Sequence, residues 1–137
     1  MARIARSTAS LRFFGDELDP DDLTKRLAGP PTKSAQKGDI RTGQSDRQYI
    51  EKTGSWRLKA SEAKPGDLNA QIQDIFASLT PDLSVWLDLS TRFRADIFCG
   101  LFMDGRNEGL EITPETLRAM GERGVTLSLD IYDPTEG

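Results

Sequence analysis

The sequence predicts a single α+β domain in which a mixed or antiparallel sheet of about four to five strands carries helices on one face. Two observations lead to this class. In several short segments apolar residues alternate with polar ones, the pattern of strands that bury one face. In other segments apolar residues recur three or four positions apart, the pattern of helices that pack on a sheet. The 137 residues suffice for one core, so we expect one domain over residues 1–137.

The first predicted elements are a strand and a helix. Residues 8–14 alternate between apolar and mainly polar side chains, and Gly15 ends this strand. Asp19 precedes Pro20, which predicts an N-cap followed by a proline at the first helical position. The helix is expected to run to about Ala28, where a Gly-Pro-Pro sequence stops it.

The middle of the chain predicts a loop, a strand and two helical segments. Residues 32–55 are rich in Gly, Ser, Thr, Lys and Arg without sustained periodicity, so we expect mostly loop with a short strand at 48–51. Residues 55–60 alternate as a strand. Apolar residues at helical spacing from 68 to 93 are interrupted by Pro81, which predicts two consecutive helices or one bent helix.

The last third predicts two strands around a helix. Residues 95–103 are nearly all apolar, as in a central strand. Thr113 and Pro114 predict the start of a helix that ends near Gly124, and residues 125–132 show the cleanest alternation in the chain. A strand followed by an X-Pro helix and a glycine thus occurs near each end, which suggests two related β-α-β halves in a ferredoxin-like or similar two-layer sandwich.

Charge and cysteine content limit the environment of the chain. The formal net charge of −4 disfavours a nucleic-acid or anionic-membrane binder, because the long-range field repels phosphates. Residues 32–60 nevertheless hold seven cations against three carboxylates, a basic stretch on an acidic body. Cys99 is the only cysteine, which fits a reducing compartment. No signal peptide or membrane-length apolar segment is recognisable, so we expect a cytoplasmic protein.

Few residues indicate chemistry. The chain has no histidine, which removes the commonest acid-base group and metal ligand. Cys99 lies in the most apolar strand, where a thiol acts as a small hydrophobic side chain and not as a nucleophile. Asp130 and Tyr132 share the outer face of the last predicted strand and, with Arg12, form either a polar patch or a solvated or helix-covered sheet face.

The densest acidic cluster lies before the first predicted helix. Asp16, Asp19 and Asp22 could supply carboxylate oxygens to a divalent metal ion. In the competing interpretation Asp19 caps the helix and Asp22 favours its positive end. The spacing does not match a calcium-binding loop.

The basic stretch supplies the candidate partner-binding residues. They are Lys33, Lys37, Arg41, Tyr49 and Trp56. Cations interleaved with aromatic rings hold phosphates and stack bases in other proteins, although no nucleic-acid motif is present. The competing interpretation is a solvated loop that leads into a strand, with Trp56 in the core.

Several segments in order carry a family resemblance. They are Leu11 to Pro20, Leu23 to Asp39, Thr53 to Trp56, Thr113 to Leu117 and Leu129 to Tyr132. Together they resemble the bacterial family of the domain of unknown function DUF4279 over nearly the whole chain. The resemblance implies the fold and carries no activity, cofactor or catalytic residue. Other small bacterial domains of this sort sometimes serve as immunity or accessory proteins. This is an analogy with a class of proteins and does not come from the residues of this chain.

We therefore expect a non-enzymatic protein-binding module, immunity-like or accessory, that needs no cofactor. The alternative is a divalent-metal-dependent hydrolase or small-ligand binder that uses the carboxylates of residues 16–22. A third hypothesis is nucleic-acid binding through residues 33–59. The sequence leaves the strand order and the oligomeric state open.

Overall fold

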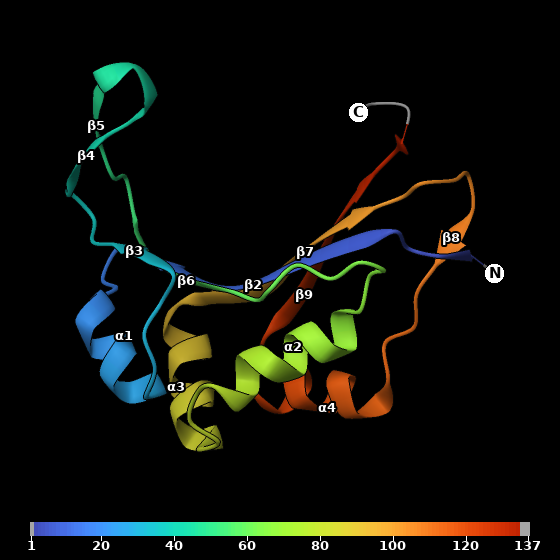
Figure 1. Cartoon of the computed structure of the whole chain (residues 1–137). Helices are drawn as coiled ribbons and strands as arrows, with labels where there is room; N and C mark the ends of the chain where they lie inside the picture. The colour runs from blue at the N-terminus through green and yellow to red at the C-terminus, as the bar shows by residue number, and fades with distance from the viewer. Residues whose placement is uncertain (1, 135–137) are drawn as a thin grey trace.

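A five-stranded mixed sheet forms the centre of the protein, for which a computed structural model describes residues 2–134 (Figure 1). Its strands stand in the order β3 (Lys33–Ala35), β6 (Gly54–Lys59), β2 (Arg6–Gly15), β7 (Arg94–Phe102) and β9 (Thr126–Tyr132). β2 runs antiparallel to β6 and β7, and β3 runs antiparallel to β6. β7 and β9 are parallel. The strand number and the mixed character agree with the sequence-based expectation.

The four α-helices of residues 2–134 lie on one face of this sheet, and a short 3-10 helix, η1 (Gln44–Asp46), lies between β4 and β5 (Figure 1). The α-helices are α1 (Pro20–Leu27), α2 (Leu68–Ala77), α3 (Leu83–Arg92) and α4 (Pro114–Glu122). The predicted caps are present, because Asp19 accepts from the Asp21 N–H and Thr113 from the Thr116 N–H. The two-layer α+β sandwich is thus confirmed. None of the described helices has the length and apolar content needed to cross a lipid bilayer.

Four short strands lie outside the main sheet. β1 (Ala2–Arg3) pairs with β8 (Glu108–Gly109), and β4 (Ile40–Thr42) pairs with β5 (Gln48–Ile50). The β4–β5 hairpin stands off the sheet on the side opposite the helices (Figure 1). The sequence predicted mostly loop here with one short strand, and the structure adds β3 and β4. No alternation marked β4 because the hairpin buries almost nothing, and β3 is only three residues long, with Ala35 as its one buried residue.

The connections differ between the two predicted halves. α4 joins the parallel neighbours β7 and β9, which makes a β-α-β unit. α1 and the hairpin join the antiparallel neighbours β2 and β6. Because α2 and α3 stand between β6 and β7, the element order also departs from the β-α-β-β-α-β of a ferredoxin-like unit. The architecture therefore belongs to the wider class of similar two-layer sandwiches.

The core lies between the sheet and the helices. Phe13 of β2 meets Trp56 of β6 edge to face, with ring centroids 6.0 Å apart, and Phe76 meets Trp86 at 5.4 Å. The Trp56 indole N–H donates to Thr24 Oγ1 at 3.1 Å, so its one polar atom is satisfied. Cys99 is fully buried here, and burial raises the pKa of its thiol to about 12. The thiol is therefore a packing group, as its apolar surroundings predicted.

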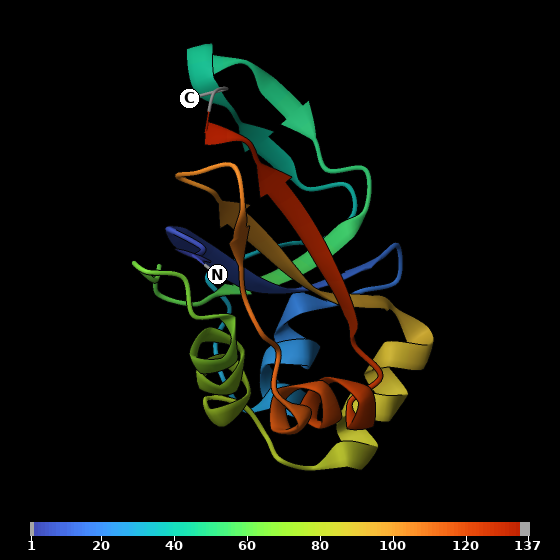
Figure 2. The same cartoon turned by 90° about the vertical axis from the view of Figure 1, so that its right-hand side faces the viewer.

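β9 has the cleanest alternation in the sequence yet buries the least of the five strands in the main sheet. Val125, just before the strand, is buried, but Leu129 and Ile131 are 48% and 58% exposed. The reason is position: β9 is an edge strand, and its second half continues past the helices (Figure 2). Alternation shows which side chains share a face, whereas coverage of that face depends on elements distant in sequence.

Burial predicts how strongly two leucines contribute to stability. Leu11→Ala, at a fully buried position of β2, should lower the free energy of unfolding by about 3 kcal/mol, because it leaves a cavity. Leu117→Ala, at a 52% exposed position of α4, should cost less than about 0.5 kcal/mol. Urea denaturation measures both values. Equal losses would contradict the described packing.

Candidate functional site

The face of the main sheet that carries no helix, called here the helix-free face, is the candidate site. On β2, buried Leu11 and Phe13 point to the helices, so the residues between them point away. Directly opposite residues on neighbouring strands share a face, and the register identifies its members. They are Lys33 and Ala35 (β3), Ser55, Arg57 and Lys59 (β6), Arg6, Thr8, Ser10, Arg12 and Phe14 (β2), Arg94, Asp96, Phe98, Gly100 and Phe102 (β7), and Thr126, Ser128, Asp130 and Tyr132 (β9).

Positive charge is concentrated on this face. It holds six cations and two carboxylates, whereas the whole chain has 18 Lys and Arg against 22 Asp and Glu. The rest of the molecule therefore carries twelve cations and twenty carboxylates. The basic stretch seen in the sequence contributes only the part of this surface that lies on β3 and β6. The remainder comes from β2 and β7, far away in sequence.

An ion pair between Arg12 and Asp96 holds the centre of the face. Arg12 Nε donates to Asp96 Oδ1 at 2.8 Å, and Arg12 Nη2 donates to Asp96 Oδ2 at 2.7 Å. Asp96 is 1% exposed and accepts a further hydrogen bond from Ser128 Oγ at 3.3 Å. These contacts with Asp96 raise the pKa of Arg12, against the opposing effect of burial. Two parallel bonds fix the guanidinium in one orientation.

A row of cations crosses three neighbouring strands. Lys33 of β3 lies directly opposite Arg57 of β6, and Arg57 lies directly opposite Arg12 of β2. Opposite side chains on paired strands stand roughly 5 Å apart at Cβ, so like charges there repel each other. Asp96 neutralises only the Arg12 end of the row. Lys33 and Arg57 lie opposite each other at the other end, and we expect their repulsion to lower the stability of the fold.

Aromatic rings stand between the arginines. The Arg6 guanidinium lies 3.7 Å from the centroid of the Phe102 ring, and Tyr132 stacks on that ring at 4.6 Å with the planes 6° apart. Arg12 lies 4.3 Å from the Phe98 ring and 5.1 Å from the Phe14 ring. Side chains of the same protein thus contact the faces of these rings. The rings are not presented flat to solvent as platforms for bases.

Four cations of the face have no acidic partner among residues 2–134. Arg6 pairs with Glu62 at 3.1 Å and Arg12 pairs with Asp96. No ion pair is formed there by the other four, which are Lys33, Arg57, Lys59 and Arg94. Lys33, Arg57 and Lys59 cluster on β3 and β6, and Arg94 lies opposite Phe14 at the same end of β2. This end of the face is suited to an anionic ligand.

The sequence-predicted partner-binding residues fall in three places. Lys33 belongs to the helix-free face. Arg41 and Tyr49 lie directly opposite each other in the β4–β5 hairpin, and Lys37, just before it, pairs with Asp16 at 3.2 Å. Trp56 has no exposed surface and packs in the core, so it cannot touch a partner of the folded chain.

The acidic cluster has other roles than metal binding. Asp19 caps α1, and Asp16 accepts from Lys37, with the pKa of Asp16 lowered by hydrogen bonds from Thr53 and Lys37. Asp22 lies in the first turn of α1. Within residues 2–134, no group of three or more acidic or cysteine side chains is arranged to hold a metal ion.

The predicted polar patch of Arg12, Asp130 and Tyr132 does lie on one face. The Tyr132 hydroxyl donates to Asp130 Oδ2 at 2.7 Å, a bond that raises the pKa of Tyr132. Sequence reasoning missed Phe98 and Phe102, because β7 is almost uniformly apolar and gave no sign of which side chains point outward. The one available signal was the pair of charged residues, Arg94 and Asp96, at alternate positions at its start.

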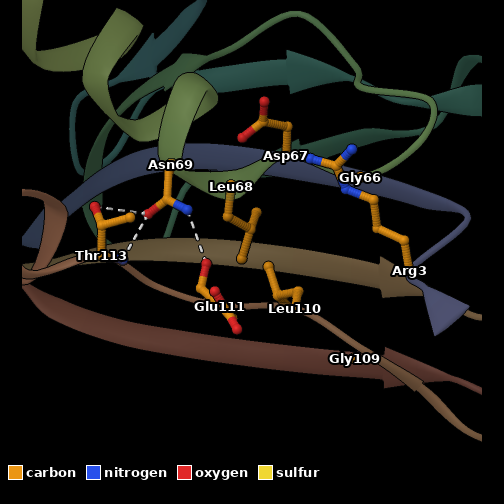
Figure 3. Close-up of a pocket in the computed structure, with 9 residues that line it drawn as sticks. All are labelled: Arg3, Gly66, Asp67, Leu68, Asn69, Gly109, Leu110, Glu111 and Thr113. Atoms are coloured by element: carbon orange, nitrogen blue, oxygen red, sulfur yellow. Dashed lines mark hydrogen bonds between the residues drawn. The ribbon is translucent and has the colours of Figure 1, made fainter. Parts of the chain in front are cut away.

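A pocket of about 440 Å³ lies at the start of α2, where the linker to α4 passes (Figure 3). Two of its polar side chains, Asn69 and Asp67, have partners in the chain. Asn69 Nδ2 donates to the Glu111 carbonyl at 2.8 Å, and Asn69 Oδ1 accepts from the Thr113 N–H at 2.9 Å. Asp67 caps α2 by accepting from the Ala70 N–H. These bonds attach the linker to the helix, and we interpret the pocket as structural.

Comparison with protein-family models gives a match over nearly the whole chain. The family model described as Domain of unknown function (DUF4279) matches residues 5–134, which confirms the resemblance seen in the sequence. No curated protein and no solved structure matches the chain. The family description names no activity, so function has to be argued from the helix-free face.

The Arg12–Asp96 pair predicts an unequal cost of single and double replacement. Arg12→Leu leaves a buried carboxylate without its counter-ion and should lower the free energy of unfolding by about 3 kcal/mol. The double variant Arg12→Leu/Asp96→Val removes both charges and should recover most of that loss. Urea denaturation compares the two. A double variant less stable than the single one would contradict this account of the pair.

The row of cations predicts that one charge reversal stabilises the protein. Lys33→Glu places a carboxylate opposite Arg57 and should raise the free energy of unfolding by about 0.2 to 1 kcal/mol at low salt. Lys33→Gln, which only removes the repulsion, should gain less. The gain should shrink at high salt because the positions are exposed. Destabilisation by Lys33→Glu would show that the cations do not repel each other.

Proposed function

The chain belongs to the DUF4279 family, whose description names no activity, and we propose that it is a non-enzymatic module that binds an acidic segment of a partner protein. The observation that carries the proposal is the row formed by Lys33, Arg57 and Arg12 on the helix-free face. These charges repel each other within the chain, and an anionic partner would relieve that repulsion. Stability given up at a surface is typical of binding sites.

The chemistry of the face favours carboxylates from a protein. Guanidinium groups such as Arg57 and Arg94 bind carboxylates through two parallel hydrogen bonds, which gives specificity as well as attraction. Nucleic acid is the less favoured ligand for two reasons. The faces of the Phe102 ring are already covered by Arg6 and Tyr132, and the net charge of −4 repels a long polyanion.

Two finer points extend the proposal. An immunity-like or accessory role is consistent with a domain that acts by docking and not by chemistry. A cytoplasmic location is supported by the single cysteine, whose thiol is buried.

Charge reversal on the face tests the proposal. Binding of labelled poly-glutamate peptide is followed by fluorescence anisotropy for the wild type, for Lys33→Glu/Arg57→Glu and for Arg106→Glu/Arg118→Glu. The second double variant has the same net charge, but its exposed residues lie in the loop after β7 and on α4. We expect the first variant to lose at least about tenfold in affinity and the second to bind like the wild type.

The same measurement with single-stranded oligothymidine separates the two kinds of ligand. Salt-sensitive binding of the oligonucleotide, without binding of the peptide, would replace the proposal by nucleic-acid recognition. Equal weakening of peptide binding by both double variants would mean that the helix-free face has no special role. In a host lysate, the native partner should be retained by the wild type and by Arg106→Glu/Arg118→Glu, and lost by Lys33→Glu/Arg57→Glu.

A further inference from the structure

The outer edge of β9 directs backbone hydrogen-bonding groups away from the sheet. The Met103 N–H donates to the Tyr132 carbonyl at 3.2 Å, so Tyr132 turns its backbone groups toward β7. Because these groups alternate along a strand, Ser128 and Asp130 do the same. Leu127, Leu129 and Ile131 therefore turn their N–H and C=O groups outward. No other strand of residues 2–134 pairs with this edge.

This edge lacks the devices that usually prevent strand pairing. Natural edge strands are kept short or carry lysine, proline or a bulge. β3, at the opposite edge of the sheet, is three residues long, contains Lys33 and follows two prolines. β9 is seven residues long, contains no lysine, arginine, proline or glycine, and has Asp130 as its one charged residue. The chain protects one edge and leaves the other available.

Exposed apolar side chains accompany the available edge. Leu129 and Ile131 point to the helix side of the sheet, where they are 48% and 58% exposed. Leu117 of α4, the helix that contacts β9, is 52% exposed. In Figure 2 this part of β9 extends beyond α4, so this helix does not cover it. Such an apolar surface beside an open edge is typical of an interface.

We propose that β9 pairs with β9 of a second copy, antiparallel about a two-fold axis through Leu129, so that two sheets become one. The sequence of the strand is self-complementary in this register. Leu129 lies opposite Leu129 of the second copy, and Leu127 lies opposite Ile131. All three residues present their N–H and C=O groups to the partner, so the pairing is hydrogen-bonded as well as apolar.

The register also avoids charge repulsion and closes the assembly. Asp130 lies opposite Ser128 of the second copy, so the one charge of β9 meets no like charge. Because β3 is protected, each copy has one available edge, and association stops at two. The axis is perpendicular to the sheet, so both helix-free faces lie on the same side of the dimer. The inference does not depend on what those faces bind.

Analytical ultracentrifugation over a range of concentrations tests the dimer. The wild type should approach twice the chain mass of 15.2 kDa. Ile131→Lys should remain at the chain mass, because the lysine would lie opposite Leu127 at the apolar contact. The matched control Ile40→Lys changes another exposed strand isoleucine, in the β4–β5 hairpin, and should dimerise like the wild type. Leu129→Pro removes an outward N–H and spares the bonds to β7, so it should also be monomeric.

If Leu129→Pro unfolds, Ile131→Lys alone tests whether β9 forms the dimer contact. A wild type that stays at 15.2 kDa at every concentration would overturn the proposal. A dimer that survives Ile131→Lys would do the same, as would open-ended association or loss of the dimer in Ile40→Lys.

Hydrogen exchange gives a second, residue-specific readout. The amides of Leu127, Leu129 and Ile131 should be protected in concentrated samples and exchange freely on dilution. The amides of Ser128 and Asp130, bonded to β7, should stay protected at both concentrations. The absence of any concentration dependence at the three odd-numbered amides would overturn the register, even for a protein that dimerises.

Discussion

The pairing of β2 with β7, fixed at its centre by the bond between Arg12 and Asp96, is the constraint on which both faces of the sheet depend. A slip of one residue in this register would turn Leu11 to the outside and Arg12 into the core. Two forces oppose the slip. Apolar burial holds one face, and the bidentate ion pair with its nearly inaccessible carboxylate holds the other. The same bond therefore supports the fold and the candidate binding surface.

The sheet separates the two tasks of this small protein. Its helix side supplies stability through an apolar core that includes both tryptophans. Its other side is held by the Arg12–Asp96 pair and by arginines stacked on aromatic rings, and some of its cations face cations. That arrangement gives an acidic chain a local positive surface without changing the overall charge, and such a surface would attract and orient an anionic partner.

The two edges of the sheet differ as much as its two faces. β3 is short and is followed by the β4–β5 hairpin, whereas β9 is long, apolar on one side and open. Pairing through β9 would give the exposed leucine and isoleucine of this strand the cover that α4 does not provide. It would also place the two cationic clusters on the same side of the joined sheet, at its two opposite ends, so that a partner with two acidic segments far enough apart would bind with increased effective concentration.

The sequence by itself determined most elements of this protein. It predicted the caps at Asp19 and Thr113, the break at Pro81 and the alternation in β2, β6 and β9. These features could be predicted because caps, turns and strand faces depend on residues that are near in sequence. The sequence also identified Lys33 as part of a basic stretch, and it predicted that Arg12 could share a polar patch with Asp130 and Tyr132. Only the tertiary structure decided that Trp56 is buried, that Leu129 and Ile131 are exposed, and that Arg12 meets Asp96 and the outward rings of β7. The physical reason is that strand order and helix coverage bring together residues more than eighty positions apart, and local patterns carry no information about such contacts.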